Sequence, residues 1–277
     1  MFWRRALSIV VLVPLVLLII YQGEWLFLVL VSAAASAMQV EYCRLARPVK
    51  EGPRATPGVN PVVPVLLTLA FCLLAFFARR LDTPDLLLAF FTGILIYVFA
   101  ESIFSGKVAG ELVTVALKLT GILIIGWGVG YHLILLRNTD EIGRQLIFLL
   151  AGTVWGSDTG AYLIGRAVGR HRLGTPISPR KTVEGTIAGL VLGTLAGLAL
   201  GAILLRETLS LANAAFIGLI LSALGQLGDL SASLVKRTAG VKDSGDAIPG
   251  HGGFLDRCDS LIFSTPVLYY YMELTRL

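Results

Sequence analysis

Residues 185–205 read GTIAGLVLGTLAGLALGAILL, an apolar run without a single charged side chain. A helix of about 20 residues is roughly 30 Å long, which matches the hydrocarbon core of a bilayer. Such runs recur along a chain of 277 residues that is 56% hydrophobic and 15% charged, with a mean hydropathy of +0.80. A soluble domain of this length would not need so many, and the alternating pattern of a membrane β-barrel is missing. The sequence therefore predicts an all-α polytopic membrane protein.

The glycines of this run recur with a period of four. Gly189, Gly193, Gly197 and Gly201 fall on one face of a helix, because residues four apart are neighbours on a helix surface. Small residues spaced in this way let helix backbones approach closely in a membrane. We expect this face to pack against other helices, and a contact between two copies of the chain is the alternative.

Apolar stretches predict about nine transmembrane helices. They are residues 5–21, 25–43, 61–78, 84–104, 111–136, 141–165, 185–205, 212–238 and 255–275. Two arginines precede the first stretch as in a signal peptide, but no small-residue cleavage site follows, so we expect an uncleaved helix. We assign residues 1–138 to a structural part with lipid or dimer contacts. Residues 139–277 are assigned to a catalytic part with its loops.

The lysines and arginines lie mostly in alternate loops, and this predicts an orientation. Positive charge favours the cytoplasmic ends of membrane spans. With nine spans, the rule places the N-terminus and the loops 166–184 and 236–257 in the cytoplasm. The net charge of +5 is then explained by topology, and we expect no nucleic-acid partner. The prediction is a multi-pass protein of the cell (inner) membrane whose active site faces the cytoplasm.

Residues 226–260, QLGDLSASLVKRTAGVKDSGDAIPGHGGFLDRCDS, concentrate charge in this apolar chain. Charge near membrane-embedded sequence is costly, so such a cluster predicts a functional site. Asp229, Ser233 and Arg237 fall four residues apart on one stripe of a helix, with Lys236 beside them. The structural alternative is that Asp229 pairs with a neighbouring helix while the cations suit the helix dipole.

The segments around this helix carry the residue types that phosphate chemistry requires. The Gly-rich turn at 245–253 exposes backbone N–H groups, which bind anionic oxygens, and Asp256 and Asp259 follow it. Carboxylates can share Mg²⁺ with phosphate oxygens while Lys and Arg neutralise the remaining charge. Residues 177–185, ISPRKTVEG, add hydroxyls and two cations before a helix N-terminus. Lipid-headgroup anchoring is the alternative for that segment.

Four further side chains lie outside these segments. Asp158, in WGSDTGAY, lies inside the sixth predicted span, and Lys118 lies inside the fifth. We expect Lys118 to snorkel or to face the protein interior. Cys43 and Cys72 belong to no CxxC pair and are expected to be small packing residues.

Residues 233–260 resemble the signature of phosphatidate cytidylyltransferases, also called CDP-diacylglycerol synthases: S-x-x-K-R-x4-K-D-x4-[LI]-P-G-H-G-G-x-x-D-R-x-D. The positions that fit it are Ser233, Lys236, Arg237, Lys242, Asp243, Ile248, Pro249, Gly250, His251, Gly252, Gly253, Asp256, Arg257 and Asp259. Two upstream elements also fit, through Asp158, Ala161, Tyr162, Gly165, Ser178, Pro179, Arg180, Lys181, Thr182, Glu184 and Gly185. The resemblance covers about 153–265, and the first 140 residues match only as hydrophobic spans. Cys258 replaces the family's usual aliphatic residue, and we assign it no catalytic role.

The resemblance implies a Mg²⁺-dependent transfer of CMP from CTP to phosphatidic acid. The products are pyrophosphate and CDP-diacylglycerol, and the latter serves phospholipid biosynthesis. It implies that Asp229 and Asp256 hold the metal, with Asp243 and Asp259 as further ligands and a second cation left open. The implied catalytic residues are Asp229, Asp256, Lys242 and Asp243. The implied substrate-binding residues are Ser178, Arg180, Lys181, Ser233, Lys236, Arg237, His251, Gly252, Gly253 and Arg257, supported by Asp158, Tyr162 and Glu184. A homodimer is also implied, because enzymes that resemble this chain dimerise.

Two roles and two other functions stay open. His251 either fixes the turn or donates a hydrogen bond, and Asp158 orients a basic residue or a ligand. A CTP-dependent polyprenol kinase or a related lipid cytidylyltransferase would use similar residues. A transporter that uses Asp158 and Asp229 as a cation path is the remote alternative, since the charge gathers at one face instead of crossing the bilayer.

Overall fold

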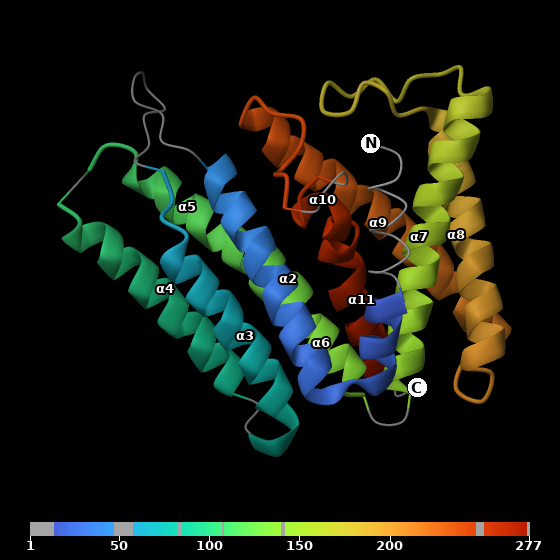
Figure 1. Ribbon diagram of the computed structural model, residues 1–277, viewed down its shortest axis with the longest axis horizontal. Helices are drawn as coiled ribbons and strands as arrows, with labels where there is room; N and C mark the ends of the chain where they lie inside the picture. Colours follow the sequence, from blue (N-terminus) through green and yellow to red (C-terminus); the bar gives the residue numbers. More distant parts are fainter. Residues whose placement is uncertain are drawn as a thin grey trace.

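The computed structural model describes residues 14–46, 58–81, 85–106, 108–139, 142–247 and 252–275, almost entirely as helices (Figure 1). Residues 14–22 are helical and lead into the first bounded element. The elements are α2 (Glu24–Leu45), α3 (Val62–Leu81), α4 (Leu86–Phe104), α5 (Glu111–Gly121), η1 (Ile122–Tyr131), α6 (His132–Arg137), α7 (Gly143–Val168), α8 (Val183–Leu204), α9 (Leu211–Thr238), α10 (Leu255–Cys258) and α11 (Leu261–Thr275). An isolated antiparallel bridge pairs Arg172 with Thr182.

Six helical segments in the described ranges are long and apolar enough to cross a membrane. They are Glu24–Leu45, Leu86–Phe104, Glu111–Arg137, Gly143–Val168, Val183–Leu204 and Leu211–Thr238. A shorter apolar segment, Val62–Phe77, lies where the third span was predicted. An all-α chain with several potential spans is confirmed, whereas the number nine stays a prediction. Much of the predicted first span, 5–21, lies outside the described residues.

The last predicted span is divided in two. The sequence indicated one helix over 255–275, but α10 ends at Cys258 and α11 begins at Leu261. The Ser260 amide and hydroxyl lie 2.8 and 3.4 Å from Oδ1 of Asp259, so a side chain takes a donor that would otherwise serve the helix. The break places Asp256 on a short helix of its own, which apolar periodicity does not indicate.

Figure 1 shows the helices in two groups, with α2 to α6 on one side, α7 to α9 on the other, and α11 between them. α11 packs against α9 on one flank and against η1 on the other. The segment η1 is a π-helix containing Gly126, Gly128 and Gly130. A side chain at Gly126 would meet the backbone of Thr68 in α3, and one at Gly128 would meet the backbone oxygen of Ile262 in α11. The glycines thus let two neighbouring helices approach the same ten-residue segment.

The glycine stripe of α8 packs within the chain, as predicted. Gly189, Gly193, Gly197 and Gly201 are all buried. A side chain at Gly197 would meet the backbone of Gly218 in α9 and the hydroxyl of Thr153 in α7. Because α7 and α9 already cover the stripe, it is not the surface through which two copies would associate.

Two expectations about isolated residues are also settled. Lys118 faces the interior, where its ammonium lies 2.8 Å from Oε1 of Glu101, and its side chain is 7% exposed. Cys43 and Cys72 are buried free thiols in the core. These residues therefore lie within the helix bundle, away from the charged cluster.

The glycine packing predicts a difference between two substitutions of the same kind. Gly197→Ala places a methyl group against the α9 backbone and should cost about 1–3 kcal/mol of unfolding free energy. Gly93→Ala in α4 meets nothing within 4 Å and should cost nothing measurable. Thermal unfolding of both variants in the same detergent checks this. Equal unfolding midpoints would show that α8 is less tightly packed than described.

Candidate active site

Two lysine–aspartate pairs lie where α8 begins and α9 ends. Nζ of Lys181, just before α8, lies 2.6 Å from Oδ2 of Asp229 in α9. Nζ of Lys236, two helical turns further along α9, donates to Oδ1 of Asp256 in α10 at 2.5 Å. Residues from three separate parts of the sequence therefore meet at one end of the bundle.

The loop that carries Lys181 is fixed by local hydrogen bonds. Thr182 caps α8, since its hydroxyl accepts from the amide of Gly185 at 3.2 Å. The Glu184 carboxylate accepts from the His171 amide at 3.1 Å, and the His171 ring nitrogen Nδ1 lies 2.6 Å from it. Glu184 thus holds the loop through His171, and its supporting role toward a substrate stays a prediction. These contacts hold the chain so that Lys181 is directed toward α9.

A second contact joins this loop to the far end of α9. The Arg237 guanidinium donates through Nε to the backbone oxygen of Ile177 at 3.2 Å and through a terminal nitrogen to that of Val241, also at 3.2 Å. The loops 166–184 and 236–257, predicted to share one face, do meet. Arg237 therefore holds the two loops together through their backbones, in addition to any role toward a substrate.

Asp256 is the most constrained carboxylate of the site. Its Oδ2 accepts from the amide and hydroxyl of Ser244, at 2.8 and 2.9 Å, and from the amide of Gly253 at 3.2 Å. Burial raises the pKa of Asp256, but the Lys236 ammonium and the Ser244 donors outweigh burial and hold the pKa below its usual range. Asp256 is therefore a carboxylate with one oxygen fixed by the turn and the other facing a cation.

The glycines of the turn make room for carboxylates. Gly252 has a φ of 82°, a left-handed conformation that glycine adopts without strain. A side chain at Gly253 would collide with the Ser244 hydroxyl and with Oε2 of Glu41. Gly252 and Gly253 were predicted to bind substrate. In the structure, the Gly253 amide donates to Asp256 and so helps to shape the site, and substrate binding by the two glycines stays a prediction.

Glu41, in α2, was missed by the sequence analysis. Its side chain is buried, and Oε2 lies 2.8 Å from the Ser244 hydroxyl and 2.9 Å from the amide of Leu255. Oε1 accepts from the amide of Phe254 at 3.0 Å. The available signal was that Glu41 is the one carboxylate within the second predicted span, 25–43. A buried acidic residue in such a segment is a functional candidate by default.

A second set of carboxylates lies around the break between α10 and α11. The Ser260 hydroxyl donates to Oδ2 of Asp158 in α7 at 3.2 Å. Asp259 is buried, and the charges of Asp229 and Asp158 lie close enough to act on it. Asp158 in α7, Asp229 in α9 and Asp259 in the turn between α10 and α11 therefore lie close enough for their charges to interact.

Other predicted site residues are more peripheral. Lys242, Asp243, Arg180 and Arg257 are exposed, and Ser178 and Ser233 are half-buried. Asp243 lines a cleft of about 470 Å³ between the end of α2 and residues 241–247, beside Glu41 and Ser244. Tyr162 is exposed and accepts from Arg166 at 3.0 Å. His251 lies outside the described residues, so its role stays a prediction.

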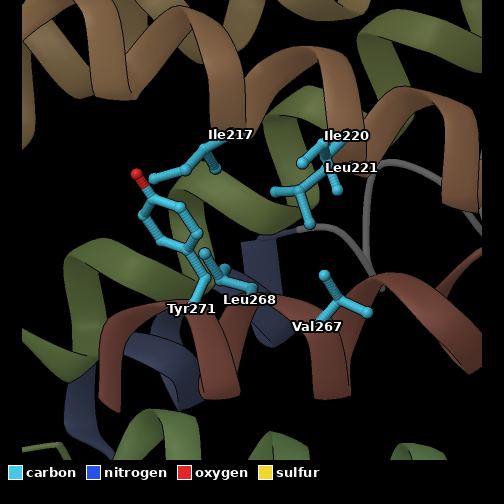
Figure 2. A pocket seen from close by; sticks show the side chains of 6 residues that line it. All are labelled: Ile217, Ile220, Leu221, Val267, Leu268 and Tyr271. Carbon is cyan, nitrogen blue, oxygen red and sulfur yellow. The ribbon is translucent and has the colours of Figure 1, made fainter. Parts of the chain in front are cut away.

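A pocket elsewhere in the bundle is apolar throughout. Figure 2 shows Ile217, Ile220 and Leu221 from α9 facing Val267, Leu268 and Tyr271 from α11. It offers no charged group for a phosphate or a metal ion. This pocket therefore lies outside the candidate active site.

The carboxylates of the site bear on whether it suits Mg²⁺. In the described ranges, no group of three or more His, Cys, Asp or Glu side chains lies close enough to form a complete metal cage. Mg²⁺ usually binds through one or two carboxylates, several waters and substrate phosphates, so a protein cage is not required. Asp229 and Asp256 each present an oxygen to a lysine ammonium, a position suited to positive charge. The residues fit Mg²⁺ brought together with a nucleotide.

Taken together, the fold and the site define a polytopic membrane protein with paired lysine and aspartate side chains at one end of its helix bundle. Its sequence matches the model of the cytidylyltransferase family over residues 3–275, so the chain belongs to that family. The resemblance inferred from the motif is thereby confirmed.

Curated relatives agree with this assignment. A protein of Synechocystis sp. named phosphatidate cytidylyltransferase is 32% identical over 98% of this chain and 96% of its own length. Relatives of the same name from Bacillus subtilis and Staphylococcus aureus (strain COL) are 40% and 44% identical. Those two matches span 52% and 50% of this chain and 53% and 54% of the relatives. The chain thus covers about half the length of these two relatives, and nearly all of the Synechocystis one.

The two lysine–aspartate pairs should differ in their contribution to stability. Lys236 and Asp256 side chains are each 10% exposed, whereas Lys181 and Asp229 are 26% and 34% exposed. Lys236→Met leaves a buried carboxylate without its cation and should cost about 3 kcal/mol. Lys181→Met breaks a partly hydrated pair and should cost about 1 kcal/mol or less. Unfolding in mixed micelles measures both, and a larger loss for Lys181→Met would contradict the burial argument.

Proposed function

We propose that this protein transfers CMP from CTP to phosphatidic acid, forming CDP-diacylglycerol and releasing pyrophosphate. Membership of the cytidylyltransferase family and relatives named phosphatidate cytidylyltransferase support the CTP-dependent formation of CDP-diacylglycerol. The observation that carries the proposal is the meeting of two lysine–aspartate pairs at one end of a bundle of apolar helices. There a water-soluble nucleotide and a lipid headgroup can reach the same side chains.

The reaction is a displacement at the α-phosphorus of CTP. A phosphate oxygen of phosphatidic acid attacks, a new P–O bond forms, and the bond to pyrophosphate breaks. The attacking phosphate is already ionised, so no strong general base is needed. Positioning and charge neutralisation therefore supply most of the rate enhancement.

The side chains of the site suit that task. Lys181 and Lys236 supply positive charge for phosphate oxygens, and Arg237 holds their two loops together. Asp229 and Asp256 would hold Mg²⁺, with Asp259 and Asp243 as further candidates and a second cation left open. The ion would neutralise charge on the nucleotide phosphates and on the leaving pyrophosphate. Ser244 and Gly253 keep one oxygen of Asp256 fixed, while the other oxygen faces the Lys236 ammonium.

The finer topology also belongs to the proposal. Lysines and arginines concentrate in alternate loops, which supports nine spans, a cytoplasmic N-terminus and a site that faces the cytoplasm from the cell (inner) membrane. A homodimer is retained, with an interface other than the covered glycine stripe of α8. Topology accounts for the basic net charge, so no nucleic-acid partner is proposed.

Product analysis tests the reaction itself. Purified protein given CTP, phosphatidic acid and Mg²⁺ should release pyrophosphate and form CDP-diacylglycerol in equal amounts. A lipid kinase would instead release CDP and pass the terminal phosphate to a polyprenol supplied in a parallel reaction. Detection of CDP without pyrophosphate would replace the proposal with the kinase.

The carboxylate role is tested by Asp229→Asn. The side chain keeps its size, and the Lys181 pair it loses is partly hydrated, so the fold should persist. Turnover should fall by about 10²–10³-fold, because an oriented charge is lost where phosphate charge must be balanced. A chelator should abolish wild-type turnover and Mg²⁺ should restore it.

Asp85→Asn, at the start of α4, is the matched control and should retain full activity. Its side chain is exposed and makes no capping bond. Near-normal turnover of Asp229→Asn would remove the metal hypothesis.

A further inference from the structure

Glu41 is a buried carboxylate whose hydrogen bonds reach across most of the sequence. Its side chain belongs to α2, yet its donors are Ser244, Phe254 and Leu255, more than 200 residues further along the chain. Glu41 itself is 3% exposed. A buried carboxylate is costly unless donors surround it, and three donors from one short stretch tie that stretch to α2.

The three donors flank Asp256. Phe254 and Leu255 immediately precede it, and their amides are among the donors that the start of α10 leaves unpaired. The Ser244 hydroxyl lies 2.8 Å from Oε2 of Glu41 and 2.9 Å from Oδ2 of Asp256. A hydroxyl has one proton, so Ser244 links the two carboxylates and serves them in turn. Any movement of Glu41 is therefore transmitted to Asp256 through Ser244 and through the backbone.

The glycines on either side of this linkage allow the chain to pack closely against Glu41. A side chain at Gly253 would collide with both Glu41 and Ser244, and one at Gly245 would meet Oε1 of Glu41 at 3.0 Å. Residues 244–245 and 253–255 thus pack directly around the Glu41 carboxylate. The backbone that leads into Asp256 is thereby held against α2.

We propose that Glu41 is a positioning residue of the active site, which sets the orientation of Asp256 by binding Ser244 and the amides of residues 254 and 255. The N-terminal helices then contribute to catalysis and do more than surround the catalytic helices. The activity readout rests on the proposed function, whereas the structural readout below does not.

The test compares Glu41→Gln with Glu24→Gln, the same change at the exposed opposite end of α2. Glutamine keeps the size of Glu41 but turns one acceptor oxygen into a donor that faces N–H or O–H groups. Turnover should fall about 10- to 100-fold, because small misplacement of a catalytic group has effects of this size. Amide hydrogen exchange should rise in residues 244–247 and 252–258 and stay unchanged in α8. Glu24→Gln should change neither quantity.

A double-variant cycle separates positioning from general destabilisation. If Glu41 acts through Ser244, then Glu41→Gln combined with Ser244→Ala should lose little more activity than the more affected single variant. Independent structural defects would instead multiply their losses. Should Glu41→Gln fail to fold, Glu41→Asp keeps the charge, shortens the reach, and is measured in the same way.

Two results would overturn the proposal. One is wild-type turnover in Glu41→Gln, and the other is unchanged exchange in residues 244–247 and 252–258. If the wild-type protein makes no CDP-diacylglycerol, the proposed function fails, and the exchange measurement still decides whether Glu41 positions the turn.

Discussion

The contact between Lys236 and Asp256 is the interaction on which the site depends. Both side chains are nearly buried, and a buried charge is tolerated only with a partner and with hydrogen bonds to its remaining atoms. Lys236 satisfies one oxygen of Asp256, and the turn at Ser244 and Gly253 satisfies the other. The position of α10 relative to α9 follows from this arrangement. The break before α11 separates α10, which carries Asp256, from the last helix.

The polar end of the bundle is supported by apolar packing further along the same helices. Gly197 and Gly218 bring α8 and α9 into backbone contact, so Lys181, just before α8, can reach Asp229 in α9. On the other side, α11 is held between α9 and η1. Small residues within the apolar helices therefore allow close packing, and this packing fixes the distances between side chains at the charged end. The same arrangement brings α2 close enough for Glu41 to bind the turn.

Much of this was predictable from local pattern. Apolar length indicated most of the helices, the period-four glycines indicated close packing of α8, and the spacing of Asp229 and Lys236 placed both on α9. The break between α10 and α11 and the π-helical segment were not predictable, because both depend on contacts with other helices. Glu41 was missed for a related reason. An acidic residue near the end of an apolar segment looks like an ordinary membrane boundary until its donors are known.

The sequence by itself determined the membrane class of the protein, its family and the residue types of its site. Hydropathy and motif spacing are properties of neighbours in the chain, and they need no knowledge of the fold. The tertiary structure decided which lysine pairs with which aspartate. It pairs Lys181 with Asp229 and Lys236 with Asp256, and it brings Glu41 to a turn more than 200 residues away. Pairing of buried charges depends on distances of a few ångströms between separate helices, and those distances are fixed only when the helices pack.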